Sequence, residues 1–173
     1  TETVPKVNKI FGPGNQYVTC AKQLVNAAAV AIDMPAGPSE LAVYADETCN
    51  PAFVAADLLS QAEHGADSQV VLVASSYAVV ENVKKEIDKQ LPVLPRKAIA
   101  ALALQNSLFI VFENVDEAFD LLNEYAPEHL ILQTRNADEM SEKIINAGSV
   151  FIGHYTPESA GDYASGTNHT LPT

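Results

Sequence analysis

The chain has 173 residues, of which 47% are hydrophobic and 18% charged, a composition typical of globular proteins that bury a core and not of disordered segments. Its 22 acidic residues outnumber its 10 basic ones, and the net charge of −12 would repel a phosphate backbone, which argues against a nucleic-acid partner. No apolar run approaches the ~20 residues of a membrane span, and no signal peptide opens the chain. We therefore expect a cytoplasmic protein with no membrane partner.

The first predicted elements are a strand, a glycine turn, a helix and a second strand. Residues 7–11 are strand-like, the turn Gly-Pro-Gly-Asn occupies residues 12–15, a helical period begins at Tyr17, and residues 28–32 form the next strand. This is the outline of a nucleotide-binding turn, but the third glycine of the dinucleotide fingerprint is missing, and Pro13 lacks the backbone donor that a phosphate needs. A tight structural turn is the favoured interpretation, and the turn assigns no cofactor-binding residue.

A boundary between lobes is predicted in the loop that follows. Residues 33–39 contain two prolines and a glycine, a composition that marks loops and domain boundaries. We therefore predict that residues 1–39 are the end of a neighbouring α/β lobe with its crossover loop, and that residues 40–173 form an α/β lobe that carries the functional site.

Apolar strands alternate with amphipathic helices through most of the second lobe. The predicted strands are residues 41–45, 69–74, 107–112, 129–133 and 149–152, and the predicted helices are residues 51–64, 78–89, 96–104, 116–125 and 138–146. This alternation predicts the α/β class, with layers α/β/α and a largely parallel, incomplete Rossmann-like sheet. From residue 153 onward the composition changes to Gly, Ser, Thr, Pro, Asn and His.

The helix predicted over residues 51–64 carries the most informative polar pattern. Asn50 can cap it, Pro51 suits its first position, and Gly65 is expected to end it in the left-handed conformation. Polar residues recur along it at helical spacing: Asp57, Ser60, Gln61 and His64. A solvated helix face is the favoured interpretation of such a stripe by itself, and a metal ion held by Gln61 and His64 beyond the helix end is the alternative.

Two further groups of polar residues could carry chemistry. Glu128 and His129 are adjacent where the chain leaves a helix and enters a strand, and a carboxylate beside an imidazole is suited to proton transfer. Asp162, in the polar C-terminal segment, could join Gln61 and His64 in a mixed oxygen and nitrogen site for zinc. Because ligand sites of open α/β sheets lie beyond the carboxyl ends of the strands, we expect the site at that edge.

Five long motifs give the chain a resemblance to a known family. They are GPGNQYV (residues 12–18), DMPAGPSE (33–40), SQAEHG (60–65), NEYAPEHL (123–130) and GDYASGTNH (161–169). In their order and spacing, over all 173 residues, the chain resembles the middle of histidinol dehydrogenase, without an N-terminal part and a C-terminal tail. We therefore expect it to be a piece of a longer protein.

The resemblance implies an activity and the residues that serve it. The family oxidises L-histidinol through L-histidinal to L-histidine with two NAD and a zinc ion, in the last steps of histidine biosynthesis. Zinc ligands at the matching positions would be Gln61, His64 and Asp162, with a fourth ligand, a histidine of the missing tail, from the other subunit of a homodimer. Glu128 and His129 would transfer protons. The substrate-binding residues would be Ser39, Gln61, His64, Asp162 and His169.

An alternative to an active enzyme stays open at this stage. Without the tail histidine, the 173 residues alone could be a catalytically inert structural core that binds metal weakly. Neither the residues that bind NAD nor the question of a single or multifunctional parent protein is decided by the sequence.

Overall fold

The computed structural model describes residues 3, 5–12, 16–28, 30–33 and 40–165. Within these ranges the chain divides into two compact units, the first ending at Asp33 and the second beginning at Glu40. The lobe boundary predicted after residue 39 falls among residues 34–39, which lie outside the described residues. Among the described helices, none is both long and apolar enough to cross a lipid bilayer.

The first unit contains the predicted strand, helix and second strand, and residues 13–15 of the predicted turn lie outside the described residues. It contains β1 (Lys9–Ile10), α1 (Gln16–Ala27) and β2 (Ala31–Ile32), and the two strands pair in parallel. Asp33 ties the unit together, because its carboxylate pairs with Lys22 and accepts a hydrogen bond of 2.9 Å from the Gly12 N–H. Lys22 also donates to the Gly12 carbonyl oxygen at 3.0 Å. The Lys22 ammonium lowers the pKa of Asp33, as expected for a carboxylate beside a cation.

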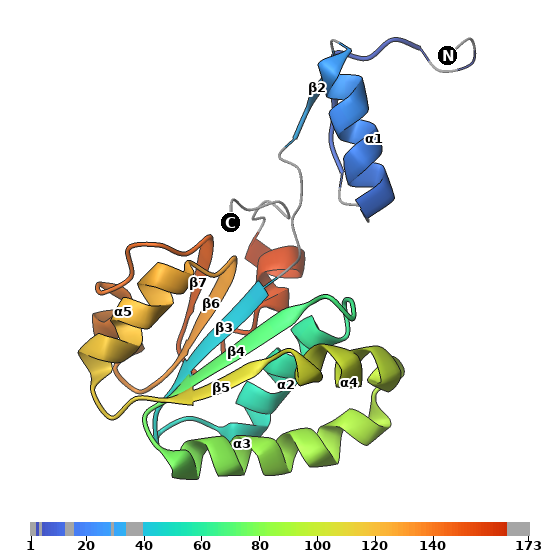
Figure 1. Cartoon of the computed structure of the whole chain (residues 1–173). Coiled ribbons are helices and arrows are strands. Elements are labelled where there is room, and N and C mark those ends of the chain that lie inside the picture. The colour runs from blue at the N-terminus through green and yellow to red at the C-terminus, as the bar shows by residue number, and fades with distance from the viewer. Residues whose placement is uncertain (1–2, 4, 13–15, 29, 34–39, 166–173) are drawn as a thin grey trace. The chain divides into compact units, whose positions relative to one another are not determined.

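The second unit, in its described part, is built on a five-stranded parallel sheet in the order β5-β4-β3-β6-β7 (Figure 1). The strands are β3 (Glu40–Ala45), β4 (Gln69–Ala74), β5 (Leu108–Val111), β6 (His129–Gln133) and β7 (Ser149–Ile152). The strand order reverses between β3 and β6, as it does in doubly wound nucleotide-binding folds. The predicted α/β class with a parallel, Rossmann-like sheet is confirmed.

Helices cover both faces of this sheet. The helical elements are α2 (Pro51–Ala62), α3 (Tyr77–Gln90), η1 (Leu91–Val93), α4 (Lys97–Gln105), α5 (Val115–Tyr125), α6 (Ala137–Ser141) and η2 (Gly161–Ser165). Side chains of α2, α3 and α4 pack on one face with Leu41, Val43 and Ile131, and side chains of α5 pack on the other with Ala42 and Leu130. Because successive strand residues point to opposite faces, an all-apolar strand supplies both cores at once.

Two helix ends differ from their predictions. Gly65 was expected to end α2 in the left-handed conformation, but it is not among the described glycines with positive φ, and α2 ends at Ala62 with Glu63 in the right-handed conformation. A Cβ atom at residue 65 would lie 2.5 Å from the Asp67 carboxylate, which is the end of an exposed side chain and could move aside. The helix predicted to reach residue 146 ends at Ser141, and turns follow it.

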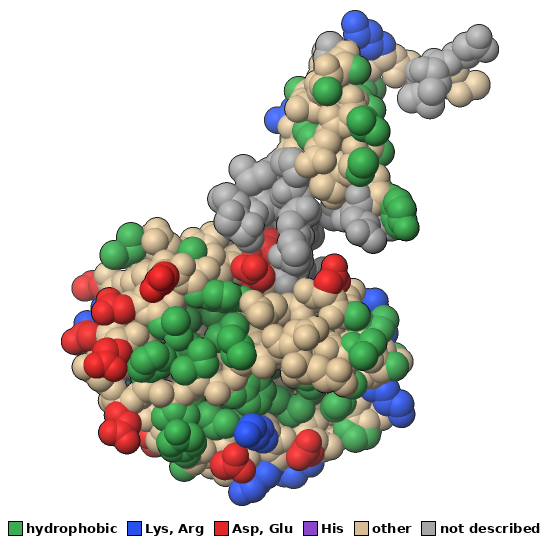
Figure 2. All heavy atoms as spheres, viewed as in Figure 1, with side chains coloured by type: hydrophobic (Ala, Val, Ile, Leu, Met, Phe, Trp, Pro, Cys, Tyr) green, Lys and Arg blue, Asp and Glu red, His purple; other side chains and the backbone are tan. Residues whose placement is uncertain are grey.

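The α5 face of the sheet is only partly covered. Figure 2 shows hydrophobic side chains gathered on this side of the second unit, with acidic side chains around them. A shallow apolar groove there has a volume of about 70 Å³. It is lined by Val71, Val73, Leu108, Ile110, Leu121, Leu122 and Tyr125.

Candidate functional site

Two of the predicted metal ligands lie at the C-terminal end of α2. Gln61 is 1% exposed, and its Nε2 atom has no hydrogen-bond partner among the described residues. The Nδ1 atom of the exposed His64 lies 2.8 Å from the Ser60 carbonyl oxygen. A carbonyl oxygen can only accept, so Nδ1 carries the proton and Nε2 keeps a lone pair for a ligand. Because Asp57 and Gln61 are both buried, the polar stripe is not merely a solvated face.

α2 packs over β3 and β4, and one hydrogen bond from β6 shows how far α2 extends along the sheet. Gln133, the last residue of β6, donates from Nε2 to Asp57 Oδ2 at 3.2 Å. From Asp57 to Gln61 the helix advances ~6 Å. α2 runs antiparallel to the strands, so this advance of the helix goes toward the start of β6. It is close to the ~6.6 Å that separates Gln133 from Ile131 along β6, so Gln61 lies about level with Ile131. The end of α2 and His129 therefore reach the same edge of the sheet.

His129 also faces α2. It alternates along β6 with Ile131, which belongs to the core shared with α2, and strand residues two apart point to the same face. Its ring centroid lies 6.0 Å from that of Phe151 in the same core. The sequence predicts the strand and the alternation of its side chains between the two faces. It does not predict that His129 points to the face that α2 covers, because this depends on the side of the sheet to which each helix crosses over.

This edge is the one at which the strands begin, not the one at which they end. Glu128 and His129 stand at the amino end of β6, and Gln61 and His64 lie where α2 has run back from the carboxyl end of β3. The expectation that these residues lie beyond the carboxyl ends is therefore wrong. The C-terminus of a helix that follows a strand and packs antiparallel to it returns to the start of that strand.

The turn before Glu128 is held in place on both sides. Ala126 ends α5 in the left-handed conformation, with φ of 51°, and its N–H donates to the Leu122 carbonyl oxygen at 3.0 Å. Asn123 Oδ1 accepts from the N–H groups of Ile145 and Asn146, at 2.7 and 3.3 Å. These contacts give the NEYAPEHL motif a structural explanation, because they fix where the chain enters β6.

Glu128 and His129 form a buried acid and imidazole pair. The Glu128 residue is 8% exposed, and its Oε2 lies 3.9 Å from His129 Nδ1, beyond hydrogen-bond length but within reach of an ion pair. The Glu128 carbonyl oxygen accepts from the Ser149 N–H at 2.9 Å, and His129 pairs with Leu41 and Ser149 in the neighbouring strands. The backbone of the pair is therefore rigid, which suits groups that must meet a substrate in one orientation.

The remaining predicted residues are only partly described. Asp162 lies in η2, a single turn of π-helix, a form that is frequent at functional sites, but its side chain lies outside the described residues. Ser39 and His169 also lie outside them. Among the described side chains, no three His, Cys, Asp or Glu residues are grouped so that they could hold a metal ion. The predicted ligand set includes a glutamine, so this finding does not test it.

A second polar group, which the sequence does not predict as a site, lies at the carboxyl edge of the sheet. Asp57 is 6% exposed, and Gln133 connects it to His154, whose Nδ1 donates to Gln133 Oε1 at 3.3 Å. Burial raises the pKa of Asp57 to about 6, although the hydrogen bond from Gln133 opposes the rise. The only sequence signal was the membership of Asp57 in the polar stripe of α2.

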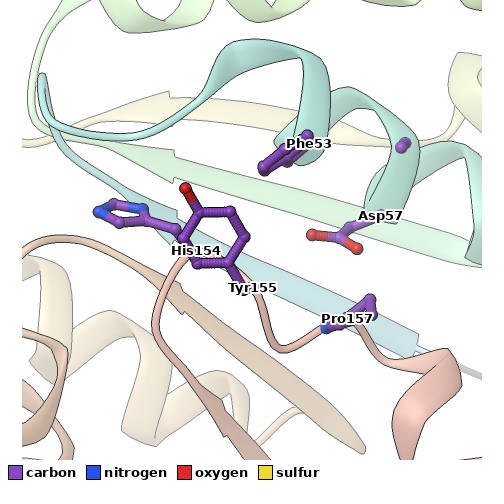
Figure 3. Close-up of a pocket in the computed structure, with 6 residues that line it drawn as sticks. Phe53, Asp57, His154, Tyr155 and Pro157 are labelled. Atoms are coloured by element: carbon purple, nitrogen blue, oxygen red, sulfur yellow. The ribbon is translucent and has the colours of Figure 1, made fainter.

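This group adjoins a cavity of about 270 Å³. Its lining residues are Phe53, Ala56, Asp57, His154, Tyr155 and Pro157 (Figure 3). Figure 3 also shows the chain running past Pro157 along α2 and entering a helical turn farther toward the C-terminal end of α2. The segment that carries Asp162 therefore leads from this cavity toward the edge at which Gln61 lies.

Comparisons with known proteins agree over the whole chain. The family model described as Histidinol dehydrogenase matches residues 1–173. Histidinol dehydrogenase of Bacteroides thetaiotaomicron is 65% identical over 173 residues, which are all of this chain and 40% of that protein. The crystal structure of histidinol dehydrogenase from Elizabethkingia anophelis is similar with a TM-score of 0.94 and 58% identity, again over 100% of this chain and 40% of that one.

A more distant likeness concerns the fold alone. An acetylating aldehyde dehydrogenase from Geobacillus thermoglucosidasius is 14% identical with a TM-score of 0.58, over 93% of this chain and 49% of that one. The chain thus spans about 40% of the length of the histidinol dehydrogenases that it matches.

Proposed function

The chain belongs to the histidinol dehydrogenase family, and we therefore propose that it supplies the proton-transfer pair and part of the metal site of an NAD-linked enzyme that oxidises L-histidinol through L-histidinal to L-histidine. The proposal is supported by the position of His129 and of the end of α2, which lie at the same edge and on the same face of the sheet. In this reading the protein is cytoplasmic, and a second subunit completes the site.

Zinc fits the residues at the end of α2. The buried Gln61 carboxamide has an unpaired Nε2 among the described residues, and its oxygen can serve as a ligand. The Ser60 carbonyl holds His64 in the tautomer that leaves Nε2 free to bind a metal, an arrangement common among metal-binding histidines. Gln61, His64 and Asp162 would hold the ion, together with a histidine of the other subunit. When bound, zinc would orient the substrate by its imidazole and amine nitrogens.

The first oxidation requires loss of the substrate's hydroxyl proton and of a hydride. His129 would accept the proton from the hydroxyl oxygen of the substrate. The carbon that carries this hydroxyl would give its hydride to NAD, when bound, and the aldehyde would form. The ring is suited to this role because β6 fixes its backbone and Phe151 lies beside it.

The second oxidation requires water to add to the aldehyde. Glu128 removes a proton from that water as its oxygen bonds to the carbonyl carbon, and the hydrate forms. His129, once it has released its first proton to solvent, would accept the hydroxyl proton of the hydrate, and a second NAD, when bound, would supply the hydride acceptor, which gives L-histidine. Glu128 is suited to this role because it is buried beside His129, at 3.9 Å, with little bulk water to compete.

A chimera tests the proposal. This chain would replace the matching 40% of the Bacteroides thetaiotaomicron protein, and turnover of L-histidinol and of L-histidinal with NAD would be measured separately. Glu128→Gln keeps the shape of the side chain but removes the base, so the aldehyde step should slow at least tenfold more than the alcohol step. His129→Asn should slow both steps. An aldehyde step that Glu128→Gln leaves intact would contradict the assigned role.

The second candidate is the inert core. It is suggested by the coverage, because the chain spans about 40% of the length of the histidinol dehydrogenases that it matches. The 173-residue chain alone should then show no turnover under conditions in which the chimera is active. Turnover by the chain alone would remove this alternative.

A further inference from the structure

The cavity at the carboxyl edge of the second unit has no part in the proposed reaction. Asp57 and Gln133 place it one to two turns of α2 away from Gln61, and it opens where β6 and β7 end, whereas His129 stands where β6 begins. Its volume of about 270 Å³ is just below the ~300–1,000 Å³ of typical small-molecule sites, so its occupant must be small.

One carboxylate in this cavity has no counter-ion among the described residues. Asp57 is 6% exposed, and among the ion pairs of the described residues none includes it. Its hydrogen-bond partner among the described residues is the neutral Gln133 amide, which donates one hydrogen bond to Oδ2. A cation stabilises a buried carboxylate that has one neutral donor more than it stabilises a carboxylate in water, because the dielectric constant around the buried group is low.

Aromatic rings and apolar groups form the rest of the wall. Phe53 and Tyr155 meet edge to face with their ring centroids 5.8 Å apart, and Ala56 and Pro157 complete the apolar surface (Figure 3). No Lys or Arg is among the residues that line the cavity. Ring faces attract cations, and the apolar walls suit a hydrocarbon body. The combination of one buried acid with two rings does not suit an anion.

We propose that this cavity is a binding site for a small organic ammonium ion, whose charged nitrogen pairs with Asp57 while its apolar body packs against the wall that Phe53 and Tyr155 form. Asp57 Oδ1 and Oδ2 accept from the ammonium group, and Gln133, held by His154, keeps the carboxylate oriented toward it. The site lies at the opposite edge of the sheet from Glu128 and His129. Binding at this site is therefore independent of the proposed reaction, and each of the two proposals can be refuted without affecting the other.

Titration of the 173-residue chain with benzylammonium chloride tests the proposal. The neutral isostere benzyl alcohol is the matched ligand, and the side-chain amide resonance of Gln133 in ¹⁵N-labelled protein reports binding beside Asp57. We expect benzylammonium to bind at least tenfold more tightly than benzyl alcohol and to shift this resonance. Equal affinity for the two compounds, or no binding of benzylammonium, would overturn the proposal.

Variants locate the effect. Asp57→Asn should remove the preference for the cation, and Asp88→Asn, on the exposed side of α3, should keep it. Tyr155 is 85% exposed, so Tyr155→Ala should fold normally and weaken benzylammonium severalfold; it keeps the test decisive if Asp57→Asn does not fold. Unchanged affinity in Tyr155→Ala together with shifts confined to other surfaces would place the binding elsewhere and refute this site.

Discussion

Substitution of Asp57 by Asn should make the protein more stable at neutral pH. The side chain is 6% exposed, and burial raises its pKa from 3.8 to about 6. A difference of about two pKa units between the unfolded and folded states corresponds to ~3 kcal/mol. Asparagine keeps an oxygen that can accept from Gln133, at 3.2 Å in the present structure, and has no charge to desolvate. The free energy of unfolding at pH 7 should therefore rise by up to ~3 kcal/mol.

The sign of the pH dependence follows from the raised pKa. Below pH ~3.8 Asp57 is protonated in both states, so it imposes no cost. Between pH ~4 and ~6 the unfolded state releases its proton first, so the native protein loses stability relative to the variant as the pH rises. Above pH ~6 the carboxyl is ionised in both states, and the difference stays at its maximum.

Urea denaturation of both proteins at pH 3, 4, 5, 6, 7 and 8 measures this difference. The contributions of the other acidic groups are the same in both proteins and cancel in the difference between their free energies of unfolding. Asp88→Asn is the exposed control, and its free energy of unfolding should stay within ~0.5 kcal/mol of that of the native protein at every pH. A difference between Asp57→Asn and the native protein that is the same at pH 3 and pH 7, or a loss of stability at pH 7, would refute the reasoning. Together with the loss of cation binding, the result would identify Asp57 as a residue kept at a cost in stability.

Three further substitutions have definite expectations. Ala126→Gly should stabilise the protein by ~1 kcal/mol in urea, because Ala126 has φ of 51° and glycine adopts this conformation without strain; destabilisation would show that the methyl group packs usefully. Asn123→Ala should cost ~0.5–1.5 kcal/mol in the same assay, since the exposed N–H groups of Ile145 and Asn146 lose their protein acceptor; a neutral result would mean that water replaces it fully. The 173-residue chain should bind zinc weakly, and His64→Ala should weaken it at least tenfold further; tight zinc binding unaffected by His64→Ala would place the metal elsewhere.

The sequence by itself determined the elements and their faces. The bounds of β4, β6 and β7 were predicted to the residue, because apolar runs between turn-forming residues depend on local pattern alone. Asn50 caps α2 as expected, with its side chain accepting from the Ala52 N–H at 3.1 Å. The motifs that carry the family resemblance are also properties of the sequence, and they need no tertiary contact to be recognised.

Only the tertiary structure decided where the polar side chains gather. The spacing of Asp57 and Gln61 on one helix face could be counted in the sequence, but their burial depends on the packing of α2 against the sheet, over β3 and β4. The hydrogen bond that fixes this packing joins Asp57 to Gln133, 76 residues away in the chain. The same packing places His129 with the end of α2 at the amino edge and leaves Asp57 beside a cavity at the carboxyl edge. Local pattern sets the face of a helix, whereas the sheet against which it packs and the direction in which it runs depend on contacts between distant segments.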